Sequence, residues 1–479
     1  MYGMKVKKCD SEADNWRSGA LCWGVALCMA TAIALPGAAL AASESRLSDK
    51  PQPYLSDEDL PARTPPILEI GDLFLGRGNL SPGFELPTGA VWQPRFWVYG
   101  TGRTSLQTFD TGRNGEQITE WANRLDLFGN LQLTGTERVL IGVTPLHRDA
   151  SFSGYTLEPD SHDGTDNELN LRLRTLFFEG DIAELFPRWD ITDSTTNDIG
   201  FSIGRQQVVF QDGVLINDTI DAVGLTRNNV RFTGVPWLVN LRTTALFAWD
   251  EIHRDDNQND NDAQLFGLFN QIDTPFSTFN FDMVYVDSSS SGGDDDVLTG
   301  AIDAVQRFGK LSTTFRVAGS YAPDRKTRTS NDGVLLFADV NWTPAYSFDL
   351  GYITAFAGFN DFTSAARDPL AGGPLGRTGL LFSARGIGTY PSALSNRAND
   401  AYGAAIGYQF LMNDKRRQLI LEAGVRKDNS TGGSDAVGVA ARFQQAFGQR
   451  FVLTLEGFGT AQEDNDEGYG MRSEILVKF

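Results

Sequence analysis

Apolar and polar residues alternate in many short segments of the chain after residue 90. In one of them, Trp121, Leu125 and Leu127 hold odd positions, whereas Arg124 and Asp126 hold even ones. Successive side chains of a β-strand point to opposite faces, so a period of two predicts strands with one apolar and one polar face. Comparable segments lie at 169–178, 241–249, 279–286, 311–321, 334–342 and 348–356.

The segment 169–178 shows the two expected faces. The apolar face is predicted to hold Leu169, Leu171, Leu173, Thr175 and Phe177. The polar face is predicted to hold Asn170, Arg172, Arg174, Leu176 and Phe178. Two arginines on one face require water there, so we expect the two faces of such strands to meet different solvents.

Short and long connections between these segments alternate along the chain. Those at 309–310 and 448–449 are short, whereas those at 250–262 and 358–400 are long. Short periplasmic turns and long extracellular loops are typical of outer-membrane barrels. We therefore predict an all-β fold, a transmembrane antiparallel β-barrel of about 18 strands (16 to 18), over residues 91–479.

The two ends of the chain indicate export. Lys5, Lys7 and Lys8 precede an apolar run at 20–35 and a small-residue cleavage site at 39–41, which predicts a signal peptide at 1–41. Residues 42–90 are rich in proline, and we expect a periplasmic leader or plug. The last alternating segment ends on the aromatic Phe479. An alternating C-terminal strand that ends on an aromatic residue is the signal that the barrel-assembly machinery recognises. We therefore expect the protein in the outer membrane of a Gram-negative bacterium.

Composition narrows the class of function. The net charge of −20 argues against nucleic acid, because phosphates require a basic face. All three cysteines lie within 1–41, which excludes thiol chemistry after processing. The three histidines lie in or beside polar loops, and no catalytic motif occurs, so we expect no enzyme, no catalytic residue, no metal site and no cofactor. The acidic loops are read as solvated surfaces facing lipid and lipopolysaccharide, with calcium binding as the alternative.

Charged residues on the polar faces are candidates for lining a pore. The break in rhythm at 204–229 suggests a loop folded into the lumen, and the long segment 358–400 is a second candidate constriction. Lumenal arginines bind carboxylates in bidentate fashion, although each of them could equally brace neighbouring strands. The predicted pore-lining and selectivity residues are Arg124, Asp126, Arg172, Arg174, Arg205, Arg242, Arg316, Arg385, Arg426 and Arg442.

Several of these stretches resemble a known family. Gly204-Arg205-Gln206, 123–126 and 134–138 are similar to segments of the alginate-export family of outer-membrane porins. The resemblance covers mainly residues 90–235. It implies an 18-stranded monomeric barrel with an arginine-lined pore that conducts an acidic polysaccharide.

These observations lead to three hypotheses. The first is a porin-like channel for diffusion or export of small anionic or saccharide solutes, including an acidic polysaccharide such as alginate. The second is an uptake channel for apolar compounds, which a lateral opening would favour. The third is a barrel with a mainly adhesive or structural role.

Overall fold

The computed structural model describes residues 63–479 except 75–79, 114–115, 190–197, 233, 291–292, 325 and 431. The predicted signal peptide at 1–41 and the start of the leader therefore lie outside the described residues. Residues 58–344 and 348–479 form one unit, which contains every element named below, and 345–347 belong with 1–57 to a second.

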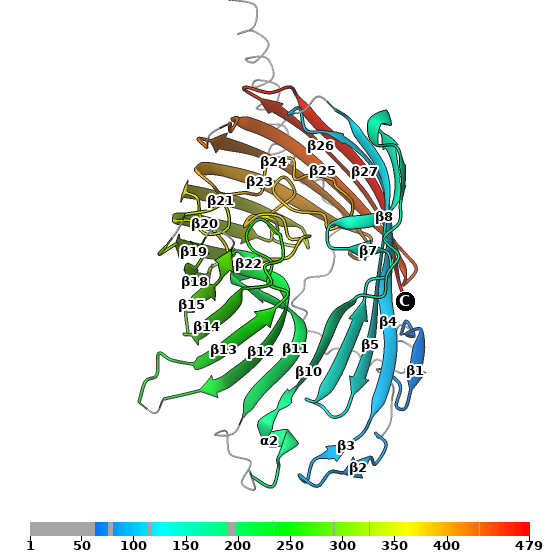
Figure 1. Ribbon diagram of the computed structural model, residues 1–479, viewed down its shortest axis with the longest axis vertical. Coiled ribbons are helices and arrows are strands. Elements are labelled where there is room, and N and C mark those ends of the chain that lie inside the picture. Colours follow the sequence, from blue (N-terminus) through cyan, green and yellow to red (C-terminus); the bar gives the residue numbers. More distant parts are fainter. Residues whose placement is uncertain are drawn as a thin grey trace, which may run out of the picture. The chain divides into compact units, whose positions relative to one another are not determined.

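In the part of the chain that the structure describes, eighteen antiparallel strands form a closed barrel (Figure 1). Each strand pairs with the next along the chain, and the last pairs with the first from Tyr469↔Asp110 to Lys478↔Thr101. The predicted fold and strand number are confirmed. The strands are β4 (Arg95–Asp110), β5 (Ile118–Gln132), β6 (Arg138–Val143), β10 (Leu173–Asp181), β11 (Ile199–Phe210), β12 (Ile216–Val230), β13 (Asn240–Asp250), β14 (Gln264–Asp273), β15 (Ser277–Asp287), β18 (Val297–Phe308), β19 (Leu311–Tyr321), β20 (Gly333–Trp342), β21 (Leu350–Asn360), β23 (Ala401–Met412), β24 (Arg417–Asp428), β25 (Ala436–Phe447), β26 (Phe451–Gln462) and β27 (Gly468–Lys478).

The structure also contains shorter elements besides the eighteen barrel strands. They are β1 (Leu68–Ile70), β2 (Phe84–Glu85), β3 (Val91–Trp92), β7 (His147–Arg148), β8 (Ser151–Glu158), β9 (Gly164–Asp166), β16 (Ser289–Ser290), β17 (Gly293–Asp294), β22 (Ala366–Arg367), α2 (Ile182–Leu185) and the 3-10 turns η1 (Asp160–His162) and η2 (Gln211–Gly213). No helix among the described residues has the length and apolar character needed to cross a membrane.

Alternation along the strands separates an apolar outer wall from a more polar interior. In β5, Trp121 is exposed whereas Asp126 and Asn130 are buried, as the sequence predicts. The outer positions of neighbouring strands repeat this pattern, with exposed Phe281, Ile302 and Val317. Exposed apolar side chains in continuous rows are what a lipid-facing barrel requires.

The predicted faces of 169–178 are wrong beyond Leu173. Pairing of β10 with β6 shifts between Leu173 and Thr175, so Arg174 is an extra residue at a bulge. The bulge exchanges the faces of all later residues in the strand. Phe177 is consequently buried, and Leu176 is exposed on the outer wall.

The described part of the leader extends the wall. β1 pairs with β4 from Leu68↔Val98 to Ile70↔Phe96, just beyond the residues of β4 that β27 occupies. The segment also contacts the barrel through one hydrogen bond, in which the Arg450 guanidinium donates to the Pro65 carbonyl at 3.3 Å. No residue of 63–74 or 80–90 lines the lumenal cavity described below.

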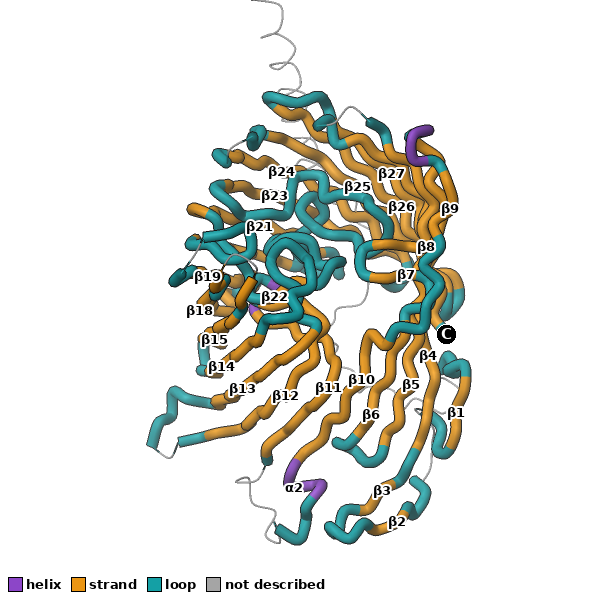
Figure 2. The backbone as a smooth tube through the Cα atoms, viewed as in Figure 1, coloured by secondary structure: helices purple, strands orange, loops and turns teal. Residues whose placement is uncertain are grey.

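Connections at the two ends differ as expected, with one exception. The end that carries 251–263, 322–332 and 361–400 has the long loops, and the other end has mostly short turns. The exception at the short-turn end is the connection 182–198, which contains α2. Figure 2 shows the loop after β21 among the strands of the barrel rather than outside them.

The lipid-facing wall can be tested on a single strand. Ile302 (53% exposed) lies on the outer face of β18, and Val305 (42% exposed) lines the lumen. Ile302→Arg should lower the free energy of unfolding from lipid vesicles by about 2–4 kcal/mol, because it places a charge in hydrocarbon. Val305→Arg should change it by less than about 0.5 kcal/mol, because that side chain meets water. Equal effects in urea titrations of the two variants would contradict the assignment of faces.

Candidate functional site

Two segments fold into the barrel from the long-loop end. The first is the tip of the β11–β12 hairpin, where Leu215, Ile216 and Ile220 are fully buried. Its turn η2 places Gln211, Asp212 and Gly213 at positive φ. The second segment is the loop 361–400, whose strand β22 pairs in parallel with β12 at Ile216↔Ala366 and Asn217↔Arg367. The hairpin tip and the loop are therefore joined by backbone hydrogen bonds.

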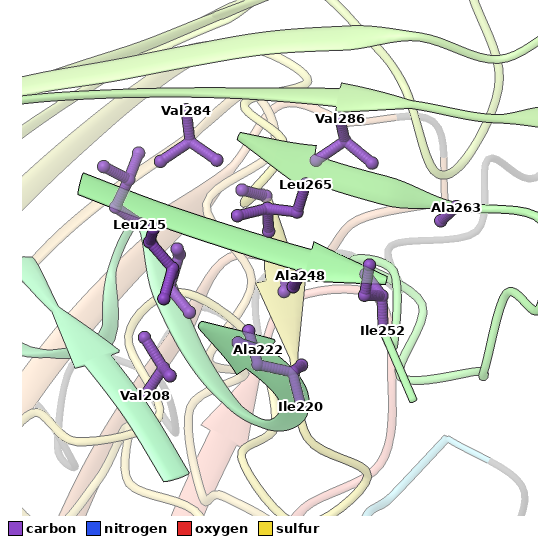
Figure 3. Packing of buried hydrophobic residues seen from close by; sticks show 14 of the residues in the cluster. Val208, Leu215, Ile220, Ala222, Ala248, Ile252, Ala263, Leu265, Val284 and Val286 are labelled. Atoms are coloured by element: carbon purple, nitrogen blue, oxygen red, sulfur yellow. The ribbon is translucent and has the colours of Figure 1, made fainter. Parts of the chain in front are cut away.

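Apolar packing fixes the hairpin tip against the inner wall. Figure 3 shows Leu215, Ile220, Leu265, Val284 and Val286 in one cluster, with side chains from the hairpin meeting those of β14 and β15. The lumen without these contacts would hold water, so each large buried side chain contributes roughly 1.5–3 kcal/mol.

The loop 361–400 forms a second apolar cluster inside the barrel. Leu375, Leu381 and Phe382 pack with Leu335 of β20 and Phe356 of β21. The Phe356 and Phe382 rings meet edge to face at 5.3 Å. Because β18–β21 and β23–β25 all contribute residues to this cluster, the loop contacts a wide arc of the inner wall.

Buried polar contacts fix the outer part of the same loop. Arg367 is fully buried and donates to the Gly213 carbonyl at 2.7 Å and to the Gly372 carbonyl at 2.7 Å. Burial lowers the pKa of Arg367 to about 10, so the guanidinium is charged at neutral pH. Asp255 of the loop 251–263 pairs with Arg397 at 2.8 Å, and burial raises the pKa of its carboxyl.

A glycine brings the loop close to β24. Gly379 has a φ of 52°, and a Cβ there would lie 2.5 Å from a Glu422 carboxylate oxygen. The close approach lets the backbone N–H groups of Leu380 and Leu381 donate to that carboxylate at 2.8 and 2.7 Å. Only a residue without a side chain fits this position.

A cavity of about 1330 Å³ remains between these segments and the wall. Its lining comes from β4, β5, β6, β10–β15, β18 and β19, together with the hairpin tip and residues 368–386 of the loop. Polar and charged side chains dominate this lining, and they are unevenly distributed.

One side of the lumen is rich in arginine. Glu456 of β26 pairs with Arg442 at 2.6 Å, with Arg472 at 3.6 Å and also with Arg385 of the loop. Burial lowers the pKa of Arg385 to about 10, which leaves it protonated at neutral pH. Glu474 pairs in turn with Arg472 at 2.9 Å and with Arg103 at 2.7 Å. Four guanidinium groups thus share two carboxylates.

The facing wall is acidic. Arg316 of β19 pairs with Asp303 at 3.1 Å and with Asp212 of the hairpin tip at 2.6 Å. Gln211 accepts from Arg316 at 2.7 Å and donates to Asp282 at 2.6 Å. Two carboxylates share one guanidinium here, and the third, Asp282, is hydrogen-bonded to Gln211 alone among these groups. The charges of the lumen are therefore segregated across it.

Two arginines of the cavity have no partner among the described residues. Arg242 on β13 and Arg377 on the loop 361–400 both line the cavity and are exposed, and neither forms a hydrogen bond or an ion pair with the described residues. Arg377 lies at the hairpin tip, where its side chain approaches Gly213. These two guanidiniums are the ones available to a solute.

The structure places the predicted pore residues in three groups. Arg426 and Arg442 occupy inward positions but do not line the cavity, and Arg426 donates to the Arg397 carbonyl at 2.7 Å. Their part in selectivity stays a prediction. The predicted residues that do line the cavity are Arg124, Asp126, Arg174, Arg242, Arg316 and Arg385.

Arg172 and Arg205 do not line the cavity, and the predicted lumenal position of Arg205 is wrong. Arg205 shares the outer face of β11 with the exposed Ile203, and it pairs with Asp221 at 2.8 Å. Arg172 precedes the bulge of β10 and pairs with Glu251 at 2.5 Å. Arg172 lies before the first residue of β10, where it contacts Glu251 rather than the cavity. The inward fold predicted at 204–229 is present, but it begins only after Arg205.

Three cavity arginines escaped the sequence analysis. Arg103 lies in β4, a stretch for which the sequence analysis assigns no faces, and Arg138 begins a strand of six residues, too short for a clear period. Arg377 lies in the long segment 358–400, where no period of two indicates which way a side chain points. Glycines on either side, Gly376 and Gly379, were the available signal that its backbone turns sharply.

Among the residues that the structure describes, no group of three or more potential ligands could hold a metal ion. The predicted absence of a metal site rests on the sequence and is not settled by this observation.

Solved structures share this architecture at low sequence identity. A BenF-like porin from Pseudomonas fluorescens is 10% identical, with a TM-score of 0.54 over 80% of this chain and 98% of that one. Outer membrane protein opdK from Pseudomonas aeruginosa is 11% identical, with a TM-score of 0.53 and coverage of 80% and 98%. Acinetobacter baumannii OccAB4 is 9% identical, with a TM-score of 0.52 and coverage of 82% and 100%.

The likeness establishes the fold. No protein-family model matches the sequence, and no curated protein matches it. The chain has the barrel architecture of outer-membrane porins, whereas the resemblance to alginate exporters stays a prediction.

The arginine-rich side gives a stability prediction. Glu456→Gln removes the carboxylate shared by Arg385, Arg442 and Arg472, and leaves buried charges without their partner. The free energy of unfolding should fall by about 3–5 kcal/mol, measured by denaturant titration in detergent. Glu467→Gln, at an exposed loop carboxylate, should leave it within about 0.5 kcal/mol. An unchanged Glu456→Gln variant would refute the bracing role of this carboxylate.

Proposed function

We propose that the protein is an outer-membrane channel through which small anionic or saccharide solutes diffuse. The observation that carries the proposal is a water-accessible cavity inside a closed barrel, with Arg242 and Arg377 exposed in it and unpaired among the described residues. The fold shared with porins supports the location and the channel class. The proposal involves no cofactor and no catalytic residue.

Charge segregation supports the preference for anions. The carboxylates of the acidic wall are held by Arg316 and Gln211, which reduces their pull on cations. Arg242 and Arg377 are not neutralised in this way. A guanidinium binds a carboxylate through two parallel hydrogen bonds, so an anion gains more from this lining than a cation does.

The in-folded segments favour small solutes over a polymer. Export of an acidic polysaccharide such as alginate requires a continuous path for a chain of sugars. The hairpin tip and the loop 361–400 instead bury two apolar clusters within the barrel. Alginate transport would require both segments to leave these clusters, so we place small anions and sugars first.

The free arginines give the test of selectivity. Arg242→Ala and Arg377→Ala should each lower the anion-to-cation permeability ratio by up to about fivefold, because a charge near a solute in water is worth roughly 1 kcal/mol. The measurement is the reversal potential of single channels in a salt gradient. Arg148→Ala serves as the control, since this exposed arginine lies outside the cavity lining.

The parent protein should itself show stable conductance with a preference for anions. A strongly cation-selective parent, or a parent whose selectivity is unaffected by both substitutions, would contradict the proposal.

A further inference from the structure

The wall of the barrel is interrupted between β10 and β11. Pairing of these strands runs from Asp181↔Gly200 only as far as Leu176↔Arg205. Beyond Arg205, residues 206–210 pair with β12 on one side, and no strand of the described chain pairs with the other side. An unpaired strand edge leaves backbone donors and acceptors that must find water or a ligand.

The interruption follows from the inward fold of the hairpin. β12 pairs with β13 only from Asp221↔Asp250 onward, whereas its first residues pair with β22 inside the lumen. The β11–β12 hairpin therefore leaves the wall at Arg205 and Asp221. On the other side of the break, residues 168–172 run alongside residues 145–147. The backbone N–H of Asn170 donates to the Pro145 carbonyl there at 3.0 Å.

The lumenal cavity reaches this break. Its lining includes Gln206 and Val208 from the inner face of β11. It also includes Gln207 and Val209, which have the opposite parity. Both faces of these residues border the cavity because the hairpin tip lies inside the barrel. The lining also includes Arg174 and Thr175 of β10, so the cavity borders both sides of the break.

The flanks of the break differ in chemistry. Leu169 and Leu171 beside it are 71% and 82% exposed. Across it, Glu251 at the end of β13 pairs with Arg172 at 2.5 Å and with Arg205 at 3.0 Å. This chain of ion pairs connects the two sides of the interruption.

We propose that the break is a lateral portal, through which amphipathic anions pass between the cavity and the lipid around the barrel. The inference rests on the proposed use of the cavity by anions. Arg242 and Arg377 hold the charged head inside the cavity, and an apolar tail leaves along Leu169 and Leu171 toward lipid. Glu251 and its two arginine partners form ion pairs across the portal that hold its two sides together, and we call these ion pairs the latch.

The test closes the portal covalently. No cysteine occurs between residues 29 and 479, so two introduced thiols are the only ones in the barrel. Leu173→Cys with Gln207→Cys places thiols on the two sides of the break, and a bis-maleimide joins them. The control pair is Phe178→Cys with Ile203→Cys, which lie opposite each other where β10 and β11 are already paired.

The readout is flux into lipid vesicles of two anions with the same head group, methanesulfonate and octanesulfonate. Cross-linking across the break should slow octanesulfonate severalfold and leave methanesulfonate and ion conductance unchanged. The control cross-link should alter neither. Glu251→Gln, which releases the latch, should accelerate octanesulfonate alone.

Other outcomes separate the portal from the channel. Unchanged octanesulfonate flux after cross-linking would overturn the portal, and so would equal slowing of both sulfonates, which indicates a shared axial route. A parent protein that passes octanesulfonate but neither methanesulfonate nor ions would support the portal and contradict the proposed channel.

Discussion

An eighteen-stranded barrel encloses more space than the side chains of its own wall can fill, and the rest of this structure follows from that constraint. Space within such a ring is occupied either by water or by chain folded in from the ends. Here the tip of the β11–β12 hairpin and the loop 361–400 enter the ring, and they bury leucine and phenylalanine side chains there. The hydrophobic effect acts on these residues because the lumen would otherwise hold water, whereas the outer wall gains nothing comparable in lipid.

Filling the lumen with chain creates a second requirement, since buried backbone and charged groups need partners. Arg367 satisfies loop carbonyls, Glu422 accepts from the N–H groups of Leu380 and Leu381, and Glu456 gathers arginines from three segments. Most lumenal charges therefore brace the in-folded segments. Arg242 and Arg377 remain open to the cavity, and selectivity is attributed to them rather than to the number of arginines present.

The period of two was enough to predict the barrel, because lipid and water enforce alternation wherever a strand is regular. It placed Arg124, Asp126, Arg242 and Arg316 on the correct face. It failed at Leu176 and Phe177, since a bulge in β10 exchanges their faces. Arg205 was misplaced because β11 bends into the lumen only after this residue. The loop 361–400 was recognised by its length, glycines and arginines, but its packing depends on contacts with β20 and β21 that no local pattern encodes. Arg377 was missed for the same reason.

The most direct test of this account is the single-channel conductance of a variant in which residues 371–395 are replaced by a short Gly-Ser linker, with β22 retained. The account predicts a barrel that still folds, shown by its resistance to denaturation in detergent, and a conductance severalfold above that of the parent. A folded variant with the conductance of the parent would show that the loop does not restrict the pore, and would contradict the central claim.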